Sequence, residues 1–252
     1  FRILDAFIRE AERRGITNYP IHVKIDTGMH RLGFLPAQIP ELIGRLKSQK
    51  GLKVKSLFSH LAASESWMFD SFTQEQIATL EAAHREICSQ LGYPVWKHIL
   101  NSAGIERFID AQWDMVRLGI GLYGVSASGL SGLRNVVTLK TTILQIQEIP
   151  NHETVGYGRK ETLNRDTRIA TIRIGYADGL DRKCGNRNGK VWINGKYAPI
   201  VGNVCMDLCM IDITGIDAKE GDTVVVFGEN LPVLEVAESI NTIPYEILTS
   251  IS

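Results

Sequence analysis

His22-Val-Lys-Ile-Asp-Thr-Gly-Met-His-Arg-Leu-Gly-Phe34 is the stretch of sequence that decides the fold. Apolar Ile21, Val23 and Ile25 alternate here with polar residues, which predicts a β-strand. The strand then breaks into a glycine-containing turn that carries a lysine, an aspartate and an arginine. Charged side chains at the end of a strand indicate a functional site, although a buried strand followed by a solvated turn would give the same pattern.

The composition is that of a globular protein. Its 252 residues, 44% of them hydrophobic, can bury the core of one large domain or of two ordinary ones. Lysine plus arginine and aspartate plus glutamate both number 28, so no net charge favours nucleic acid or an anionic membrane. No apolar run approaches the roughly 20 residues of a membrane-spanning helix. We therefore expect a soluble, cytoplasmic protein that binds neither nucleic acid nor a membrane.

The cysteines predict neither a metal site nor a disulfide framework. They lack the paired C-x-x-C spacing of a zinc site, and a chain of this size has no need of cross-links. We expect free thiols at Cys88, Cys184, Cys205 and Cys209.

Helix and strand patterns alternate through the first half of the chain. Apolar residues at helical spacing predict three helices, which end at Gly15, Gly51 and Gly92. Thr73 and Gln76 have the spacing of a capping box at the start of the third helix. Further strands are predicted at 52–61, 95–100 and 115–123.

Each of these strands delivers polar or glycine residues at its end. They are Ser59-His60, Asn101-Ser102, and Arg117 with Gly119-Ile120-Gly121. This is the pattern of a parallel α/β sheet or barrel with its site at the carboxyl ends of the strands. Four strands are too few to close a ring of eight, so residues 1–134 are predicted to be the second half of a TIM-type barrel.

Beyond a linker at 126–132 the pattern changes to that of an antiparallel β domain, residues 135–252. Alternating apolar residues predict strands near 137–143 and 169–174, and Val224–Phe227 predicts a buried one. Asn194-Gly195 between two apolar runs is a strong signal for a hairpin turn. Only 233–240 and the segment after Pro244 have a helical pattern.

The polar motifs, taken together, resemble those of one enzyme family, the alanine racemases. In the family's order they are Lys24-Ile-Asp-Thr-Gly-Met-His-Arg31, Ser59-His60-Leu-Ala, Asn101-Ser102-Ala, Met115-Val-Arg117-Leu-Gly119-Ile120, Gly156-Tyr157-Gly, Gly175-Tyr176-Ala-Asp-Gly and Gly202-Asn-Val-Cys205-Met206-Asp207. The resemblance implies a (β/α)8 barrel that binds pyridoxal 5'-phosphate, a C-terminal β domain and a head-to-tail homodimer. It also implies an isomerase that interconverts L-alanine and D-alanine and supplies D-alanine for peptidoglycan.

Racemisation requires a proton to leave one face of the α-carbon and another to arrive at the opposite face. The resemblance assigns one base to Tyr157, acting in the partner subunit's site, and the other to the lysine that holds the cofactor. A free tyrosine has a pKa of about 10, so a tyrosine that acts as a base needs a cationic or hydrogen-bonding neighbour. His60 and Arg117 resemble the residues that provide this network in the family. Tyr157 could alternatively be a turn residue between two glycines. Arg117 could alternatively be a strand-end residue that pairs with a nearby carboxylate.

The resemblance also implies binding roles. The cofactor would be contacted by Arg31, His60, Asn101 and Arg117. The alanine substrate would be contacted by Arg31, Tyr176 and Met206. The phosphate would take the Ser102 hydroxyl and backbone N–H groups, which are accessible at Gly119 and Ile120. Asn101 and Ser102 also fit a helix N-terminus, and the Met206 side chain fits a sheet core. Within the turn, Asp26 is predicted to bond its own backbone.

Lys24 is a candidate for carbamylation, because the matching lysine is carbamylated in parts of the family. A carbamate would convert a cation that repels Arg31 into an anion that holds it.

Two departures from the family's pattern concern the ends of the chain. The family's cofactor lysine lies upstream of the first residue here, and an Arg-rich segment of the family lies downstream of the last. We therefore expect that the 252 residues alone cannot complete turnover. The alternatives are a barrel-type amino acid decarboxylase, a serine or broad-specificity racemase, and a non-catalytic interaction or regulatory fragment.

Overall fold

The computed structural model describes residues 1–130 and 132–251. Its contacts divide the chain into two compact units. Unit 1 comprises Phe1–Gly121 with Ser126–Gly132, and unit 2 comprises Leu122–Val125 with Leu133–Ser252. Each unit has its own buried hydrophobic core.

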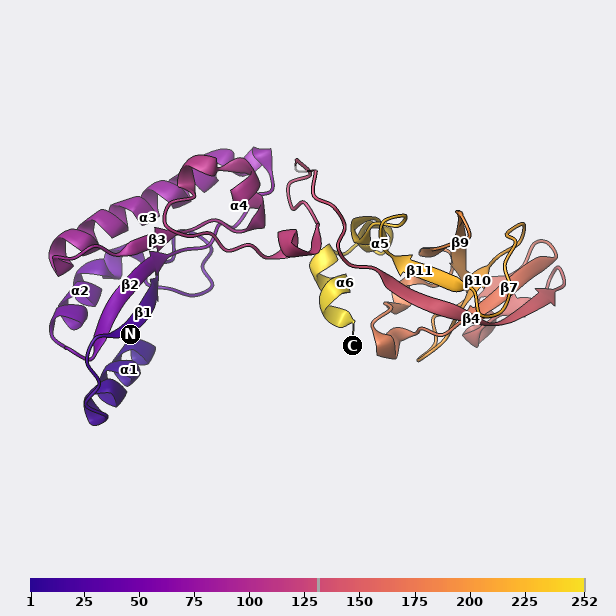
Figure 1. Ribbon diagram of the computed structural model, residues 1–252, viewed down its shortest axis with the longest axis horizontal. Helices are drawn as coiled ribbons and strands as arrows, with labels where there is room; N and C mark the ends of the chain where they lie inside the picture. Colours follow the sequence, from indigo (N-terminus) through magenta and orange to yellow (C-terminus); the bar gives the residue numbers. More distant parts are fainter. Residues whose placement is uncertain (131, 252) are drawn as a thin grey trace. The chain divides into compact units, whose positions relative to one another are not determined.

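Unit 1 is an α/β layer built on a parallel sheet of order β1-β2-β3 (Figure 1). The strands are β1 (Tyr19–Lys24), β2 (Leu52–Phe58) and β3 (Trp96–His98). The helices are α1 (Arg2–Arg13), α2 (Ile39–Lys47), α3 (Asp70–Leu91) and α4 (Ser102–Arg107), with 3-10 turns η1 (Pro36–Gln38), η2 (Trp67–Phe69) and η3 (Ile109–Ala111). A further 3-10 turn, η4 (Ile120–Tyr123), begins in unit 1 and ends in unit 2. Val23 and Leu57 on the sheet are buried in one core with Leu42 of α2 and Leu80 of α3.

The opposite side of this sheet carries polar and aromatic residues. A register shift after Ile21 sets His22 opposite Ser56 and Lys24 opposite Phe58, and Phe58 in turn pairs with His98. Because side chains alternate along a strand, these residues share one side of the sheet. We call it the polar face, made of His22, Lys24, Ser56, Phe58 and His98.

The turn after β1 is held by Asp26, as predicted. Its Oδ1 accepts hydrogen bonds from the backbone N–H groups of Gly28 and His30, both at 3.0 Å. The turn closes where Phe34 N–H donates to the Lys24 carbonyl at 2.9 Å. Gly33 is required here, because its φ is +123° and a Cβ would lie 2.8 Å from the backbone nitrogen of Asp26.

The predicted capping box at Thr73 and Gln76 is wrong. Helix α3 begins at Asp70, directly after the 3-10 turn η2, and both residues lie buried inside it. The Gln76 amide accepts from Ala62 N–H at 3.0 Å and donates to the His60 carbonyl at 3.1 Å. Gln76 thus holds the segment that follows β2 rather than the start of its own helix.

The predicted strand at 115–123 is also wrong. Arg117 N–H still donates to the Leu100 carbonyl just beyond β3, at 3.0 Å. Gly119 and Gly121, however, both turn their N–H groups toward the Ser102 hydroxyl, and residues 120–123 form the 3-10 turn η4. The N–H groups of Gly119 and Gly121 therefore cannot pair with a neighbouring strand. The described part of unit 1 has three parallel strands, which confirms an α/β unit but does not display a complete barrel.

Unit 2 is an antiparallel β domain, as predicted, and its main sheet closes on itself. The order around this barrel is β10-β7-β4-β11-β8-β9. Its strands are β4 (Leu139–Ile149), β7 (Thr167–Ile172), β8 (Lys190–Ile193), β9 (Lys196–Val201), β10 (Cys209–Asp212) and β11 (Thr223–Phe227), and a small ribbon pairs β5 (Thr154–Val155) with β6 (Glu161–Thr162). The remaining elements are η5 (Tyr157–Arg159), η6 (Tyr176–Asp178), η7 (Arg182–Cys184), α5 (Val233–Ser239) and α6 (Pro244–Ser250).

The hairpin predicted at Asn194-Gly195 joins β8 to β9. Both residues have positive φ, +45° and +83°, which suits a two-residue turn between right-twisted strands. Closure of the barrel then buries alternate residues of each strand, among them Val191, Ala198 and Ile211.

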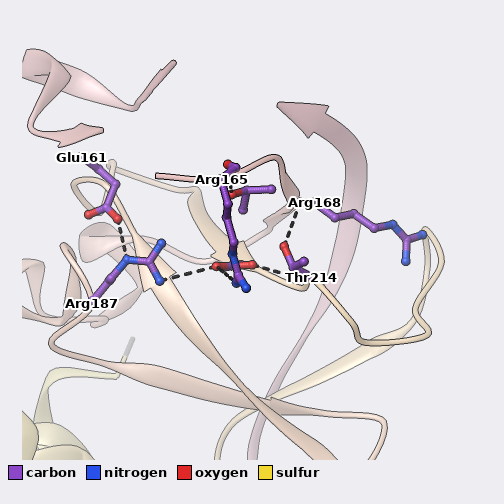
Figure 2. A network of polar contacts seen from close by, with 7 residues as sticks. Glu161, Arg165, Arg168, Arg187 and Thr214 are labelled. Carbon is purple, nitrogen blue, oxygen red and sulfur yellow. Dashed lines mark hydrogen bonds and ion pairs between the residues drawn. The ribbon is translucent and has the colours of Figure 1, made fainter. Parts of the chain in front are cut away.

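A buried carboxylate joins three segments of unit 2 (Figure 2). Asp212, at the end of β10 and only 4% exposed, accepts from Arg165 at 3.1 Å and from Arg187 at 3.4 Å through Oδ2. Its Oδ1 accepts from Thr214 N–H at 3.0 Å. Arg187 also donates to Glu161 at 2.6 Å, so the carboxylate and the β5-β6 ribbon share one arginine.

Two further features concern the described residues as a whole. None of their helices combines the length and apolar character needed to cross a membrane. The four cysteines are free thiols, as predicted, and no group of three or more histidine, cysteine, aspartate or glutamate side chains in this part of the chain is arranged to hold a metal ion.

Candidate functional site

Arg117 occupies the centre of a hydrogen-bonded cluster in unit 1. Its Nη2 donates to the carbonyl oxygens of Ser59 at 2.6 Å and Ile99 at 3.1 Å, which are the first residues after β2 and β3. Nη2 also lies 3.2 Å from His60 Nδ1, and Nη1 lies 2.6 Å from His98 Nδ1. Among the described residues no acceptor contacts the Arg117 Nε–H, so this donor remains available to a ligand.

His60 is held neutral by its surroundings. Burial lowers its pKa first, and the positive charges of Arg117, Arg31 and Lys24 lower it further, from 6.5 to about 4. Because the arginine only donates, His60 Nδ1 must be the accepting nitrogen. Its proton therefore lies on Nε2, which can donate to another group.

Lys24 and Arg31 add positive charge to this cluster. Burial lowers the pKa of Lys24, and the charges of Arg31 and Arg117 lower it further, while Asp26 opposes them. The Lys24 ammonium lies 5.8 Å from the centre of the Phe58 ring on the polar face. Arg31 is exposed on the turn that follows β1. Three cations around one neutral histidine make this region of unit 1 suited to an anionic ligand.

A second part of the site lies at the start of α4. The buried hydroxyl of Ser102 accepts from Gly119 N–H at 3.0 Å and from Gly121 N–H at 3.3 Å. Since the hydroxyl accepts from both glycines, its own proton can be donated elsewhere. Asn101 is the predicted N-cap, and its side-chain oxygen accepts from Gly104 N–H at 2.9 Å and from Ser64 Oγ at 2.8 Å. Ile120 follows Gly119 with its side chain buried.

Three residues that support Arg117 were not predicted from the sequence. His98 accepts a hydrogen bond from Arg117. The centre of the Phe58 ring lies 5.5 Å from Arg117 Cζ, and Ser56 Oγ lies 3.2 Å from His98 Nε2. The sequence signal that could have indicated them is the alternation of side chains along the strands at 52–58 and 96–98. This alternation puts the three residues on the same side of adjacent strands. That pattern could not reveal which ends of the side chains meet.

Tyr157 lies in unit 2, on the loop that joins the two strands of the β5-β6 ribbon. Gly156 and Gly158 flank it with φ of +76° and +75°, and the residue is 73% exposed. The Asn203 side chain donates to the Tyr157 carbonyl at 2.7 Å. The backbone is thus fixed while the phenol remains free to reach a ligand or another molecule.

Tyr176 and Met206 lie on adjacent segments of unit 2. Tyr176 N–H donates to the Cys205 carbonyl at 3.0 Å, and Ala177 N–H donates to the Met206 carbonyl at 2.8 Å. Gly175 permits this approach, because a Cβ there would lie 2.3 Å from the Met206 carbonyl. Residues 202–206 therefore contact the Tyr157 loop at one end and the Tyr176 turn at the other.

A cavity of about 490 Å³ opens between the β5-β6 ribbon and the barrel of unit 2. Its lining includes Tyr157, Cys205 and Met210. The predicted residues thus form two clusters. In unit 1 these are Lys24, Arg31, His60, Asn101, Ser102, Arg117, Gly119 and Ile120, and in unit 2 they are Tyr157, Tyr176 and Met206.

Two family descriptions match the chain in sequence. "Alanine racemase, N-terminal domain" matches residues 4–127, and "Alanine racemase, C-terminal domain" matches residues 136–252. The alanine racemase of Clostridium difficile 630 superposes with a TM-score of 0.89 at 34% identity, covering 100% of this chain and 67% of that one. This chain belongs to the alanine racemase family. The resemblance inferred from the motifs is thereby confirmed.

Other alanine racemases give the same result. A crystal structure from Bartonella henselae "with covalently bound pyridoxal phosphate" matches with a TM-score of 0.86 and 34% identity, over 99% of this chain and 68% of that one. The alanine racemase of Helicobacter pylori (strain J99 / ATCC 700824) is 37% identical over 247 residues, which are 92% of this chain. The chain spans 65% of the length of that relative.

Proposed function

We propose that the protein containing this chain is an alanine racemase that interconverts L-alanine and D-alanine with pyridoxal 5'-phosphate. It would supply D-alanine for peptidoglycan in the cytoplasm. The observation that carries this proposal is the match of both units to the two domains of one family. The cationic cluster around Arg117 supports it, because both the substrate and the cofactor are anionic.

The residues present fit such a cofactor. Ser102 can donate its hydroxyl proton to a phosphate, and Ile120 can offer its backbone N–H beside it. Gly119 would offer its N–H by leaving the Ser102 hydroxyl, to which it donates at 3.0 Å in this structure. Arg117 retains the Nε–H for the pyridine nitrogen, and Arg31 would bind the ring oxygen and the substrate carboxylate. When bound, the cofactor supplies an electron-withdrawing ring that lowers the cost of removing the α-proton.

Arg117 would bind the pyridine nitrogen without protonating it, since a guanidinium keeps its proton near neutral pH. By donating to this nitrogen without protonating it, Arg117 would weaken the electron withdrawal that the cofactor supplies, which would favour return of a proton to the α-carbon. We therefore propose that Arg117 favours racemisation over transfer of the amino group to the cofactor. Arg117→Glu should increase transamination per turnover. An unchanged ratio of the two products would refute this role.

Tyr157 would be one of the two bases, with its phenol acting on the α-proton in the partner's site of a head-to-tail homodimer. The lysine that holds the cofactor in the family would be the other. Tyr176 would border the substrate, and Met206 would offer its backbone N–H to the carboxylate. His60 would present its Nε2–H and link these groups to Arg117. We also infer that unit 1 contributes its parallel strands to a (β/α)8 barrel.

Lys24 is proposed as a carbamylation site. Only the neutral amine reacts with carbon dioxide, and the lowered pKa of Lys24 increases its neutral fraction. The resulting anion would lie near Arg31 and Arg117 and would offset their charge. A crystal structure grown with bicarbonate should show density beyond Lys24 Nζ, and a bare amine there would end this proposal.

The experiment that tests the function uses the complete protein with pyridoxal phosphate and each enantiomer of alanine in turn. We expect each enantiomer to be converted to the other, as followed by chiral chromatography. Release of carbon dioxide would identify a decarboxylase instead, and faster conversion of serine a broad-specificity racemase. No reaction would point to a non-catalytic protein.

A further inference from the structure

A continuous line of hydrogen bonds runs along the polar face from His22 to Arg117. His22 Nδ1 lies 2.5 Å from Ser56 Oγ, which lies 3.2 Å from His98 Nε2. His98 Nδ1 then lies 2.6 Å from Arg117 Nη1. Each strand of the sheet contributes one member, since His22 is on β1, Ser56 on β2 and His98 on β3. The line therefore depends on the register of all three strands.

Arg117 sets the direction of every bond in this line. Its guanidinium can only donate, so His98 Nδ1 must carry a lone pair. The proton of neutral His98 is then on Nε2 and is donated to Ser56. Having accepted there, Ser56 can donate its own proton to His22 Nδ1. Each donor thus has an acceptor, and reversing any one bond would set two donors or two acceptors face to face.

The ring of His98 is held in place. It is 3% exposed and stacks on Phe58 with ring centres 5.1 Å apart and planes 5° from parallel. Burial lowers its pKa first, and the charges of Arg117 and His22 lower it further, to about 4, although Asp114 opposes them. The imidazole is therefore neutral at physiological pH, as acceptance from Arg117 requires.

We propose that His98 is a positioning residue for Arg117, and that Ser56 holds it by accepting the Nε2–H. Two backbone carbonyls fix Nη2 of the guanidinium, and His98 fixes Nη1. With both nitrogens held, the plane of the guanidinium and the direction of its Nε–H are determined. This proposal deepens the proposed function, on which its catalytic consequence rests, but the tautomer of His98 does not depend on that function.

A simple structural role is the alternative, in which His98 and Ser56 form a buried polar pair that only stabilises unit 1. The two explanations differ in the state of the ring. A positioning role requires a bare Nδ1 throughout the working pH range, whereas a stabilising pair would tolerate either tautomer. They also differ in whether His98→Asn, which keeps an acceptor near the former Nδ1, should recover the kcat lost in His98→Leu.

The first experiment is ¹⁵N NMR of the complete protein labelled at histidine, without added cofactor. We expect His98 to show an unprotonated Nδ1 and a protonated Nε2 from about pH 6 to about pH 8. In Arg117→Met this preference should weaken, since the donor that imposes it is gone. A protonated Nδ1 in the wild-type protein, or an unchanged tautomer ratio in Arg117→Met, would overturn the proposal.

The second experiment compares variants of the cofactor-loaded protein. His98→Leu removes the acceptor, and kcat for alanine should fall by about 10²-fold with KM changed by less than about threefold. His98→Asn returns an oxygen close to the former Nδ1 and should recover at least about tenfold of this loss. Equal losses in the two variants, or a loss confined to KM, would show that His98 does not position Arg117.

Ser56→Ala and Thr73→Val form a matched pair, because each removes a buried hydroxyl from unit 1. Thr73 Oγ1 has no hydrogen-bond partner among the described residues, so its loss should leave kcat unchanged. Ser56→Ala should lower kcat by about tenfold. Equal values in the two variants would remove Ser56 from the proposal. If the wild type lacks racemase activity while His98 keeps the expected tautomer, the proposed function fails and the geometry of the line stands.

Discussion

Arg117 Nη2 lies 3.2 Å from His60 Nδ1, so a permanent cation faces a nitrogen that would become positive on protonation. Burial lowers the pKa of His60, and the charge of Arg117 lowers it further, to about 4. Burial and the Arg117 charge likewise bring the pKa of His98 to about 4. Both imidazoles are therefore neutral at physiological pH. In the family's chemistry, this would leave His60 as a donor through Nε2 rather than as a cation.

The stability of the protein should consequently fall as the pH drops from about 6.5 to about 4. In this window the unfolded chain binds protons at both histidines, whereas the folded chain excludes them, so protons favour unfolding. Urea denaturation across this range should give a free energy of unfolding that rises with pH. The double variant His60→Asn with His98→Asn should flatten this slope. Curves for the two proteins that run parallel below about pH 6.5 would contradict the prediction.

Asp212 should contribute strongly to the stability of unit 2. Burial raises the pKa of this carboxyl, but hydrogen bonds from Thr214 and Arg165 outweigh burial and hold it below its ordinary value. Asp212→Ala removes a buried carboxylate that accepts hydrogen bonds from Thr214 and from two arginines, so we expect a loss of about 2–3 kcal/mol. Chemical denaturation measures this loss. As a control, Glu148→Ala breaks an exposed pair with Arg168 and should cost less than about 0.5 kcal/mol. Equal costs would show that burial of Asp212 adds nothing.

Gly175→Ala should disturb the contact between the Tyr176 turn and Met206. A Cβ at this position would lie 2.3 Å from the Met206 backbone, so the two segments must separate. We expect a loss of about 1–3 kcal/mol in the free energy of unfolding. Gly44→Ala is a suitable control, since a Cβ on that exposed face of α2 meets no atom within 4 Å. It should stabilise the protein by about 0.5–1 kcal/mol. Thermal melts of both variants provide the comparison, and an unaltered Gly175→Ala would contradict the predicted contact.

Mixing two variants that are each impaired in racemisation should test where Tyr157 acts. If Tyr157 serves the partner's site, a dimer of one Tyr157→Phe chain and one Arg117→Glu chain contains one intact site and one doubly altered site. Random exchange makes half of the dimers mixed, so activity should recover to about a quarter of the wild-type value. Each variant alone is the control. No recovery, with mixed dimers demonstrated by mass, would place Tyr157 in the site of its own chain.

Much of the fold follows from local rules that the sequence displays. Helical spacing located α1, α2 and α3, and Asn194-Gly195 located the hairpin because few residues other than asparagine and glycine accept two consecutive positive φ angles. Asp26 was predictable as a turn residue, since its partners lie two and four positions away. In each of these cases the interacting groups are close in sequence.

The errors arose where a distant residue competed with the local pattern. The alternation at 115–123 predicts a strand, but the Ser102 hydroxyl takes the N–H groups that a neighbouring strand would need. Thr73 and Gln76 have capping-box spacing, but the Trp67–Phe69 turn starts the helix earlier and Gln76 is occupied by the His60 segment. Both competing interactions involve residues far away in the sequence, so the local pattern does not reveal them.

The sequence by itself determined the α/β and antiparallel β halves, the order of the motifs and the family. It did so because side-chain periodicity and turn chemistry act over a few residues. Only the tertiary structure decided that His98 and Ser56 support Arg117, and that the backbone of the Tyr176 turn is hydrogen-bonded to the segment that carries Met206. Those contacts join strands and loops many residues apart, and they depend on a strand register and on a close backbone approach at Gly175. Hydrogen-bond direction and side-chain distance are properties of that arrangement.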